Sequence, residues 1–313
     1  MNRSRSLATM VAVVGLLGLA ACGSDSGGSP LGNGGSGGGA TGSPAPSDTI
    51  VVGSANFPEN VLLMNIYAEA LKAKGVKVET KPNIGSRETY IPGLKDGSID
   101  LIPEYSGVLL QYFDKGATAV SPDDVYAALQ KALPANLIVL DKSSAQDKDA
   151  VVVTKQTADK YHLKSIADLK PVAGKLNLGG PPEWKTRETG VPGLKKKYGL
   201  TFKSFVSLDT AGPLTIQALK SGRVDAADVF TTDPSIAQNG WVILKDPKNL
   251  FAAQNVVPLI NKAKAGDTVR ATLNQVSKKL DTQELGELVK QVVADKKNSD
   301  TVAKNWLSSK GLT

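Results

Sequence analysis

The sequence predicts an α/β protein whose folded part is divided into two lobes. The stretch from Asp48 to Thr313 holds 266 residues (313 − 47), more than the roughly 100–150 residues of a typical domain. Along this stretch, short β-branched runs alternate with segments of helical periodicity, which favours mostly parallel sheets covered by helices. A seven-residue pattern also occurs twice, as two halves built on one plan would produce.

The first elements follow from local patterns. Residues 49–53 form a short β-branched run and predict a buried strand. Apolar residues then recur at helical spacing between Pro58, which suits a first turn, and Gly75, which suits a helix end. The alternating run 76–80 predicts a second strand. Residues 121–133 begin with Ser-Pro-Asp-Asp, the form of a helix start, and predict a further helix.

Strands and helices continue in the second half of the chain. Residues 150–153 and 240–244 predict two more buried strands. The last fifty residues have helical patterns, and Asp281 and Glu284 have the spacing of a pair that caps a helix. Trp306 is expected to anchor this helical part in the core.

One seven-residue pattern is repeated. Residues 94–100 (LKDGSID) match residues 219–225 (LKSGRVD) at a constant separation (222 − 97 = 125). Each copy predicts a helix end, a glycine stop and a strand that begins beside the aspartate. An aromatic residue follows each aspartate by five positions, Tyr105 and Phe230, and two similar lobes would turn these aromatics toward one cleft. The alternative is that the pattern is merely a common helix-to-strand turn.

The N-terminus has the layout of a bacterial secretory signal peptide. Arg3 and Arg5 form a basic region, residues 7–20 are apolar, and small residues precede Cys22, the only cysteine. Cys22 resembles the lipidated cysteine of bacterial lipoproteins; the alternative is an unmodified thiol. We predict a signal peptide over 1–21 and a protein anchored by lipid to the outer face of the cell membrane. A membrane-spanning helix needs about 20 consecutive apolar residues, and no stretch after Cys22 approaches that length.

Residues 22–48 are predicted to be the lipidated cysteine and a flexible tether. After Cys22 they consist almost wholly of small and polar residues, which bury too little apolar surface to fold. They contain a Gly-x-Gly-x-x-Gly pattern at 32–37. A dinucleotide site needs a strand before this pattern and a helix after it, and the sequence predicts neither here, so we reject the match. Without Arg3 and Arg5 the chain has 35 basic residues (37 − 2) against 30 acidic ones. This mild excess, without a basic stripe of interleaved aromatics, does not indicate nucleic-acid binding.

From Asp48 on, the sequence has none of the common catalytic motifs. Its one histidine, His162, lies in a polar stretch, and a single histidine and a single cysteine cannot form a zinc cluster. Neither a Gly-x-Ser-x-Gly elbow nor a Walker loop occurs there. We therefore expect a monomeric binding protein without cofactor or metal. A secreted carboxylate-only hydrolase stays open as an alternative, and its candidate residues are Glu104, Asp149, Glu183 and Asp228.

Several motifs, spread through residues 49–309, resemble one known family. This family is the substrate-binding proteins of osmoprotectant ABC importers, which take up glycine betaine, choline, carnitine and proline betaine. The resemblance implies a type II periplasmic-binding-protein fold with a small-molecule solute in its cleft, and a permease and ATPase complex as partner. The motifs are Gly53-Ser54-Ala55-Asn56-Phe57-Pro58-Glu59, Pro103-Glu104-Tyr105-Ser106-Gly107, Pro182-Glu183-Trp184, Arg187-Glu188, Gly190-Val191-Pro192-Gly193-Leu194 and Thr231-Thr232-Asp233.

The resemblance also implies domain boundaries. Lobe I is expected to comprise residues 49–147 plus 256–313, and lobe II residues 148–255. Two crossover segments, near Lys148 and Gln254, are expected to join the lobes. The ligand is expected to bind between them as they close about this hinge.

Members of this family hold a quaternary ammonium group in a cage of aromatic faces, and an arginine pairs with the ligand carboxylate. Tyr105 matches a cage tyrosine, Phe230 matches the aromatic before the Thr-Asp pair, and Arg187 matches the carboxylate-binding arginine. Trp184 is either a third face or a packing residue beneath the Arg187 loop. The predicted ligand-binding residues are Tyr105, Phe230, Arg187, Asp149, Gln254, Trp184, Asn56 and Thr231.

Three departures from the family pattern affect the ligand. Asp149 stands where relatives have a cage tyrosine, Gln254 and Asn255 stand near where they carry aromatics, and Ala55 stands where many have lysine. Two lost faces at about 0.5–2 kcal/mol each predict weak binding of glycine betaine. Asp149 would attract a cation, and Gln254 suits hydroxyl or carbonyl groups. A betaine- or choline-like ligand and a non-quaternary solute with a ring or hydroxyls both stay open.

Overall fold

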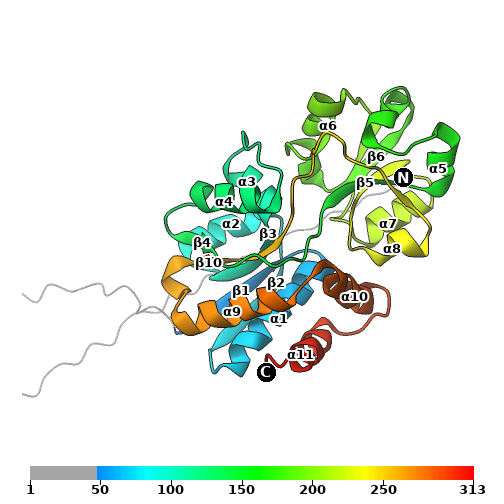
Figure 1. Cartoon of the computed structure of the whole chain (residues 1–313). Helices are drawn as coiled ribbons and strands as arrows, with labels where there is room; N and C mark the ends of the chain where they lie inside the picture. Colours follow the sequence, from blue (N-terminus) through cyan, green and yellow to red (C-terminus); the bar gives the residue numbers. More distant parts are fainter. Residues whose placement is uncertain (1–47) are drawn as a thin grey trace, which may run out of the picture. The chain divides into compact units, whose positions relative to one another are not determined.

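The structure is a computed structural model, and it describes residues 48–313. The predicted signal peptide (1–21), Cys22 and the tether as far as residue 47 lie outside the described residues. The described part forms two five-stranded sheets with their helices (Figure 1). Among these residues no helix is both long and apolar enough to cross a bilayer.

The first sheet belongs to lobe I, which is the name kept below for this sheet and its helices. Its strand order is β2-β1-β3-β10-β4. Strand β10 runs against its neighbours β3 and β4, whereas β1 is parallel to β2 and β3. The strands are β1 (Ile50–Ala55), β2 (Val78–Gly85), β3 (Leu101–Tyr105), β4 (Leu137–Val139) and β10 (Val256–Asn261).

The second sheet, with its helices, is called lobe II, and it repeats this plan with the order β7-β6-β8-β5-β9. Here β6 is parallel to β7 and β8, and β5 is the reversed strand. The strands are β5 (Asp149–Val153), β6 (Asn177–Gly180), β7 (Ser204–Ser207), β8 (Ala226–Phe230) and β9 (Val242–Ile243).

Both sheets are thus mixed, and the reversed strand has the same origin in each. Strand β5 begins directly after the chain passes from lobe I to lobe II, and β10 begins directly after the return. Asp149 at the start of β5 pairs with Phe230 at the end of β8, and Val256 at the start of β10 pairs with Tyr105 at the end of β3. Each crossing chain therefore enters its sheet at the carboxyl end of the central strand and must run antiparallel to it.

Helices cover the sheets in both lobes (Figure 1). Those of lobe I bury a core that includes Trp306, which is 5% exposed. Four shorter helices belong to lobe II. The helices are α1 (Pro58–Ala73), α2 (Arg87–Asp96), α3 (Ser106–Phe113), α4 (Pro122–Ala132), α5 (Lys155–Tyr161), α6 (Val191–Tyr198), α7 (Pro213–Lys220), α8 (Pro234–Gln238), α9 (Asp267–Lys279), α10 (Thr282–Val293) and α11 (Ser299–Ser309), and 3-10 turns lie at Ile166–Leu169, Ala173–Lys175, Pro182–Lys185 and Lys262–Lys264.

Helix starts that the sequence predicts have the expected caps. The Ser121 side chain accepts a hydrogen bond from the backbone N–H of Asp124 at the start of α4. Asp281 accepts one from the N–H of Glu284 at the start of α10, as its spacing predicted. The strand predicted over 240–244 is shorter in the structure, because only Val242 and Ile243 pair with β5. His162 is exposed at the left-handed end of α5.

The repeated seven-residue pattern marks the same place in each lobe. Gly97 ends α2 with φ 82°, and Gly222 follows α7 with φ 74°, a region that favours glycine. The aspartate that ends each copy of the repeat accepts a 2.8 Å hydrogen bond from a backbone N–H of the neighbouring strand. Asp100 accepts it from Val51, and Asp225 accepts it from Asn177. The repeat is therefore a structural one, in which each aspartate links the two central strands of its sheet.

Two crossover segments connect the lobes and lie side by side (Figure 1). Gln146 and Asn255 form an isolated antiparallel bridge, and the N–H of Asp147 donates to the carbonyl of Gln254 at 3.2 Å. Because the chain crosses twice through this paired ribbon, the ends of β3, β5, β8 and β10 meet near it.

Candidate ligand-binding site

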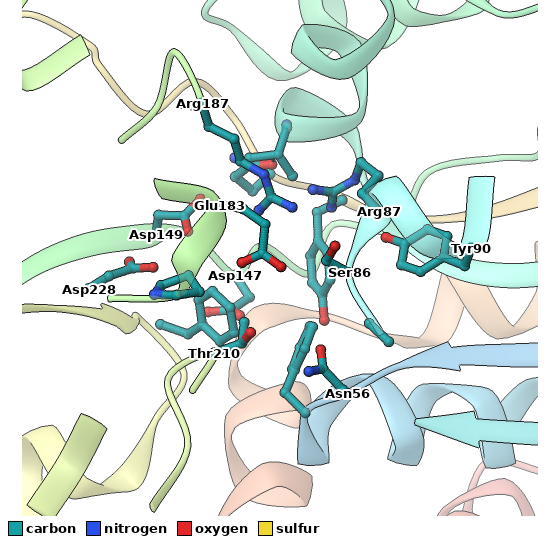
Figure 2. Close-up of a pocket in the computed structure, with 17 residues that line it drawn as sticks. Asn56, Ser86, Arg87, Tyr90, Asp147, Asp149, Glu183, Arg187, Thr210 and Asp228 are labelled. Atoms are coloured by element: carbon teal, nitrogen blue, oxygen red, sulfur yellow. Dashed lines mark hydrogen bonds between the residues drawn. The ribbon is translucent and has the colours of Figure 1, made fainter. Parts of the chain in front are cut away.

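A pocket lies between the lobes, beside the crossovers and at the carboxyl ends of the central strands, the edge of an α/β sheet where ligands commonly bind (Figure 2). Six of the eight predicted ligand-binding residues line it: Asn56, Tyr105, Asp149, Arg187, Phe230 and Gln254. Further lining residues that the prediction did not include are Phe57, Arg87, Tyr90, Asp147, Glu183 and Asp228.

Three aromatic rings meet at this pocket. The ring of Phe57, which follows β1, has its centroid 6.1 Å from that of Tyr105 and 5.0 Å from that of Phe230. Tyr105 comes from lobe I and Phe230 from lobe II, so Phe57 connects the two predicted faces. Phe57 was not among the predicted site residues, although it belongs to the family motif at 53–59, just beyond the strand predicted over 49–53.

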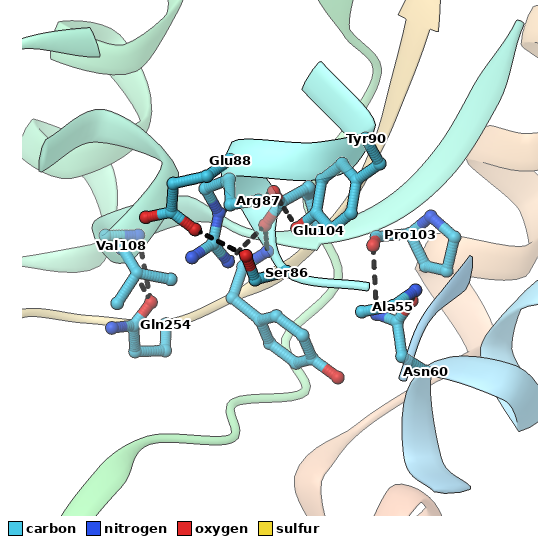
Figure 3. Close-up of polar contacts among 12 residues, drawn as sticks. Ala55, Asn60, Ser86, Arg87, Glu88, Tyr90, Pro103, Glu104, Val108 and Gln254 are labelled. Atoms are coloured by element: carbon cyan, nitrogen blue, oxygen red, sulfur yellow. Dashed lines mark hydrogen bonds and ion pairs between the residues drawn. The ribbon is translucent and has the colours of Figure 1, made fainter. Parts of the chain in front are cut away.

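A buried ion pair supports the lobe I side (Figure 3). Arg87 donates from Nε and Nη2 to the two carboxylate oxygens of Glu104, at 2.6 and 2.8 Å. The hydroxyl of Tyr90 and the N–H of Tyr105 also donate to Glu104, at 2.6 and 2.9 Å. Burial opposes the charge of Arg87, but the adjacent Glu104 carboxylate outweighs this and raises the pKa of Arg87. This set holds the Tyr105 backbone in place.

Gln254 is tied to the same wall of the pocket. Its Oε1 accepts the N–H groups of Gly107 and Val108, at 3.1 and 3.0 Å (Figure 3). These belong to the first turn of α3, where backbone N–H groups have no partner within the helix. The side-chain carbonyl therefore caps α3, and the same residue lines the pocket.

A second Arg–Glu pair spans the two lobes. Arg187 of lobe II donates to both oxygens of Glu88 in α2, at 3.1 and 2.8 Å. The side chains are 22% and 47% exposed. Partial burial by itself would raise the pKa of Glu88, but hydrogen bonds and charge from Arg187 outweigh it and hold the pKa at about 2. Arg187 is therefore already paired in this structure.

A further polar contact between the lobes lies behind the aromatic rings. Glu59 accepts hydrogen bonds from the hydroxyls of Tyr105 and Thr232, at 2.7 and 2.6 Å. Asp147 accepts from the Thr231 hydroxyl and the Thr232 N–H, both at 3.1 Å. Burial raises the pKa of both Glu59 and Asp147. The predicted site residue Thr231 does not line the pocket, because its hydroxyl bonds Asp147 and the N–H of Lys148.

The remaining predicted residue, Trp184, is a packing residue. It is 1% exposed and stacks on Phe251, with centroids 6.1 Å apart and an interplanar angle of 21°. The 3-10 turn Pro182–Lys185 directs this indole into the lobe II core, beneath the loop that carries Arg187. Of the two alternatives considered for Trp184, the structure thus shows packing rather than an exposed face.

Asp149 and Asp228 form the lobe II side of the pocket (Figure 2). Asp228 is fully buried, and among the described residues neither of its oxygens has a hydrogen-bond partner. Burial raises the pKa of both carboxyls, more than the positive charge of Arg187 lowers it. For Asp228 the charge of Asp149 adds to the effect of burial.

Carboxylates outnumber cations around this pocket. Arg87 and Arg187 are each paired with a glutamate. Beyond those pairs, five acidic side chains lie in or beside the pocket, and they are Glu59, Asp147, Asp149, Glu183 and Asp228. Burial favours the neutral form of four of them, Glu59, Asp147, Asp149 and Asp228. A positively charged group in the pocket would favour their ionised form, and the aromatic rings offer it faces. Among the described residues there is also no group of three or more side chains placed to hold a metal ion.

Comparison with known proteins is consistent with this geometry. Residues 48–309 match the family described as the substrate binding domain of ABC-type glycine betaine transport systems. The carnitine transport binding protein OpuCC of Listeria monocytogenes is 26% identical over 268 residues, which cover 83% of this chain and 86% of that one. The ergothioneine transport permease/ergothioneine binding protein EgtU of Helicobacter pylori is 26% identical over 266 residues, 84% of this chain and 48% of that one. A crystal structure titled as a glycine betaine/carnitine/choline ABC transporter has the same fold, with a TM-score of 0.66, 24% identity and coverage of 84% of this chain and 99% of that one.

Proposed function

This chain belongs to the family of substrate-binding domains of ABC-type glycine betaine transport systems, and we propose that it captures a small cationic solute for an ABC importer. In this role the protein binds and releases a solute and carries out no reaction. We propose a quaternary ammonium compound as the ligand and lipid attachment through Cys22 as the anchor that keeps the receptor at the membrane.

The surplus of acidic side chains beside three aromatic rings carries this proposal. A quaternary ammonium group gains about 0.5–2 kcal/mol from each desolvated ring face it touches. Phe57, Tyr105 and Phe230 offer such faces at this pocket. Asp149 and Asp228 line the same pocket, and each adds charge attraction when it is ionised.

The state of the two arginines bears on the choice between a cation and a zwitterion. A ligand carboxylate could pair with Arg187 only by displacing or sharing Glu88, and Arg87 is already paired with Glu104 through Nε and Nη2. A free ligand carboxylate would also lie among unpaired acidic groups. We therefore expect choline, which has no carboxylate, to bind more tightly than glycine betaine.

Calorimetry and thermal unfolding test this proposal. We expect choline to raise the melting temperature of the purified protein, because a ligand at 100 times its Kd stabilises the native state by about 2.7 kcal/mol. Glycine betaine and carnitine should shift it less at equal concentration. Failure of all three compounds to bind, or tightest binding by glycine betaine, would contradict the proposal as stated.

A solute with a ring or hydroxyls is the second candidate. The hydrogen-bonding side chains of Asn56, Ser86 and Thr210 also line the pocket, and a planar ring could stack on Phe57 or Phe230. The Helicobacter relative is named for binding ergothioneine, which has a ring, a quaternary ammonium group and, like glycine betaine, a carboxylate. Stronger stabilisation by ergothioneine than by choline would favour this candidate.

Closure about the two crossovers is the motion we propose for ligand capture. The bridge between Gln146 and Asn255 joins the two crossover segments, with Lys148 and Gln254 next to it in the chain. The contacts of Arg187 with Glu88 and of Thr232 with Glu59 join the lobes on either side of the aromatic rings. Small-angle scattering with and without choline should show contraction of a monomer on binding.

A further inference from the structure

Asp228 is a buried carboxylate without a hydrogen-bond donor. It is 0% exposed, it lines the pocket, and no described residue donates to either of its oxygens. An ionised acid in this condition would destabilise the unliganded fold, so without a ligand Asp228 depends on a proton shared with the neighbouring Asp149. Its persistence in the wall of a binding pocket therefore points to a group that arrives from outside the protein.

Strand pairing brings Asp149 to the same place. Antiparallel β5 and β8 pair Asp149 with Phe230 and Val151 with Asp228. Paired residues in an antiparallel sheet point to the same face, so the two aspartates are diagonal neighbours on one face. This juxtaposition exists only because β5 runs against β8.

Apolar groups cover the inner side of Asp228. A Cβ built on Gly180 in β6 would lie 3.4 Å from both the Asp228 Cβ and Cε3 of Trp184. Glycine at this point lets the aspartate and the indole pack closely. The carboxylate is thereby shielded from water on that side and directed to the pocket.

The positive charges near the two aspartates offset their negative charge only in part. Arg187 and Arg87 attract the carboxylates, but each is paired with another acid, Glu88 and Glu104 respectively. Asp147 at the crossover adds negative charge close to Asp228. Seven other charged side chains lie around this pair. Glu183 and Arg187 follow β6, Arg87 and Glu88 belong to α2, Glu104 belongs to β3, Asp147 to the crossover and Glu59 to α1.

We propose that Asp149 and Asp228 together bind the cationic head of the ligand, and that one proton leaves this pair for each cation bound. The inference rests on the proposed function and adds to it a recognition group other than the aromatic rings. Without ligand, the two carboxyls share one proton. When a cation enters, that proton passes to the solvent, and the doubly ionised pair faces the cation.

The proton exchange predicts the direction of the pH dependence. The pKa of the pair is raised in the unliganded protein, so below that pKa each cation must displace a proton. Affinity for a cation should fall up to about tenfold per pH unit as the pH decreases, and level off above the raised pKa. The contribution of the pair to the stability of the unliganded protein should change in the opposite direction and decrease as the pH rises. A raised pKa in the folded state stabilises the fold at low pH, and this stabilisation is lost as the pH rises through the raised pKa.

Titration calorimetry with choline tests the inference. Measurements at about pH 6 and about pH 8, each in two buffers of different ionisation enthalpy, count the protons released. We expect release approaching one proton per choline at a pH below the raised pKa, and tighter binding at the higher pH. Asp228→Asn should abolish the release and weaken choline about 10- to 100-fold, as loss of a contact to a charged group does.

A stability measurement and a matched control separate this role from a structural one. Asp228→Asn keeps the shape but removes the buried charge, so at about pH 8 the unliganded variant should melt at a higher temperature than the wild type. Asp159→Asn removes one carboxylate from exposed α5 and should leave choline affinity and proton release unchanged.

The outcomes distinguish the inference from the proposed function. Choline binding without proton release, or full affinity in Asp228→Asn, would overturn the inference and leave the receptor function standing. If choline, carnitine and glycine betaine all fail to bind the wild type at about pH 8, the quaternary ammonium proposal and this inference fail together.

Discussion

Two Arg–Glu pairs of similar geometry differ mainly in burial, which makes them a matched test of what supports the pocket. Arg87 bonds Glu104 at 2.6 and 2.8 Å, with side-chain exposures of 8% and 0%. Arg187 bonds Glu88 at 3.1 and 2.8 Å, with exposures of 22% and 47%. If Coulomb attraction alone mattered, loss of either arginine would cost a similar free energy of unfolding. Because the first pair is buried and the second is partly exposed, we expect the two costs to differ.

Arg87→Ala should lower the free energy of unfolding by about 3–5 kcal/mol, because it leaves the buried charge of Glu104 without its cation. Only the Tyr90 hydroxyl and the Tyr105 N–H would still donate to that carboxylate. The corresponding fall in melting temperature is about 6–20 °C for a protein of this size class. Arg187→Ala should cost only about 0–1 kcal/mol, since water replaces the lost partner.

Urea unfolding of the unliganded protein, followed by circular dichroism, measures both changes. The difference between the two variants is the informative quantity, because both lose an arginine of similar contacts. Equal destabilisation by Arg87→Ala and Arg187→Ala, or a loss below about 1 kcal/mol for Arg87→Ala, would refute the reasoning from burial.

The other changes act on anchoring and on ligand binding. Cys22→Ala should move the protein from the membrane fraction to the soluble secreted fraction without changing its melting temperature; retention in the membrane fraction would argue against lipidation. Arg187→Ala should weaken glycine betaine more than choline in calorimetry, because only the former has a carboxylate to pair; an equal loss for both would remove Arg187 from that role. Tyr105→Ala should weaken choline about 2- to 30-fold through loss of one ring face, whereas Tyr105→Phe should retain most of the affinity; unchanged choline binding in Tyr105→Ala would mean that this face does not touch the ligand.

Short-range features could be predicted because the interacting groups are neighbours in the chain. The Asp281 cap reaches a backbone N–H only three residues away, and the glycine stops at Gly97 and Gly222 depend on local backbone conformation. The repeated pattern was also readable, since it combines a helix end, a glycine and a strand start within seven residues. Family membership followed from motifs whose residues are adjacent in the chain.

Roles that depend on distant partners could not be predicted in this way. Gln254 and Thr231 were both predicted to bind the ligand. Gln254 lines the pocket, but its side-chain oxygen also caps α3 from 147 residues away. Thr231 does not line the pocket and bonds Asp147, 84 residues before it. A polar side chain in a sequence has many potential partners, and folding selects the one that leaves fewest buried groups unpaired. Trp184 could be either a ligand face or a packing residue, and only the direction of its 3-10 turn decided the matter.

The two aspartates at the pocket show which features the sequence determines and which depend on the tertiary structure. The amino-acid order alone indicates that Asp149 directly precedes a strand at 150–153 and that a strand follows the second copy of the repeat and leads through Asp228 to Phe230. Whether they share a face depends on the direction in which β5 enters the sheet of lobe II, and that direction follows from the crossover between lobes. Local patterns specify which residues form strands, but the pairing of strands is a long-range choice made by the burial of the whole fold.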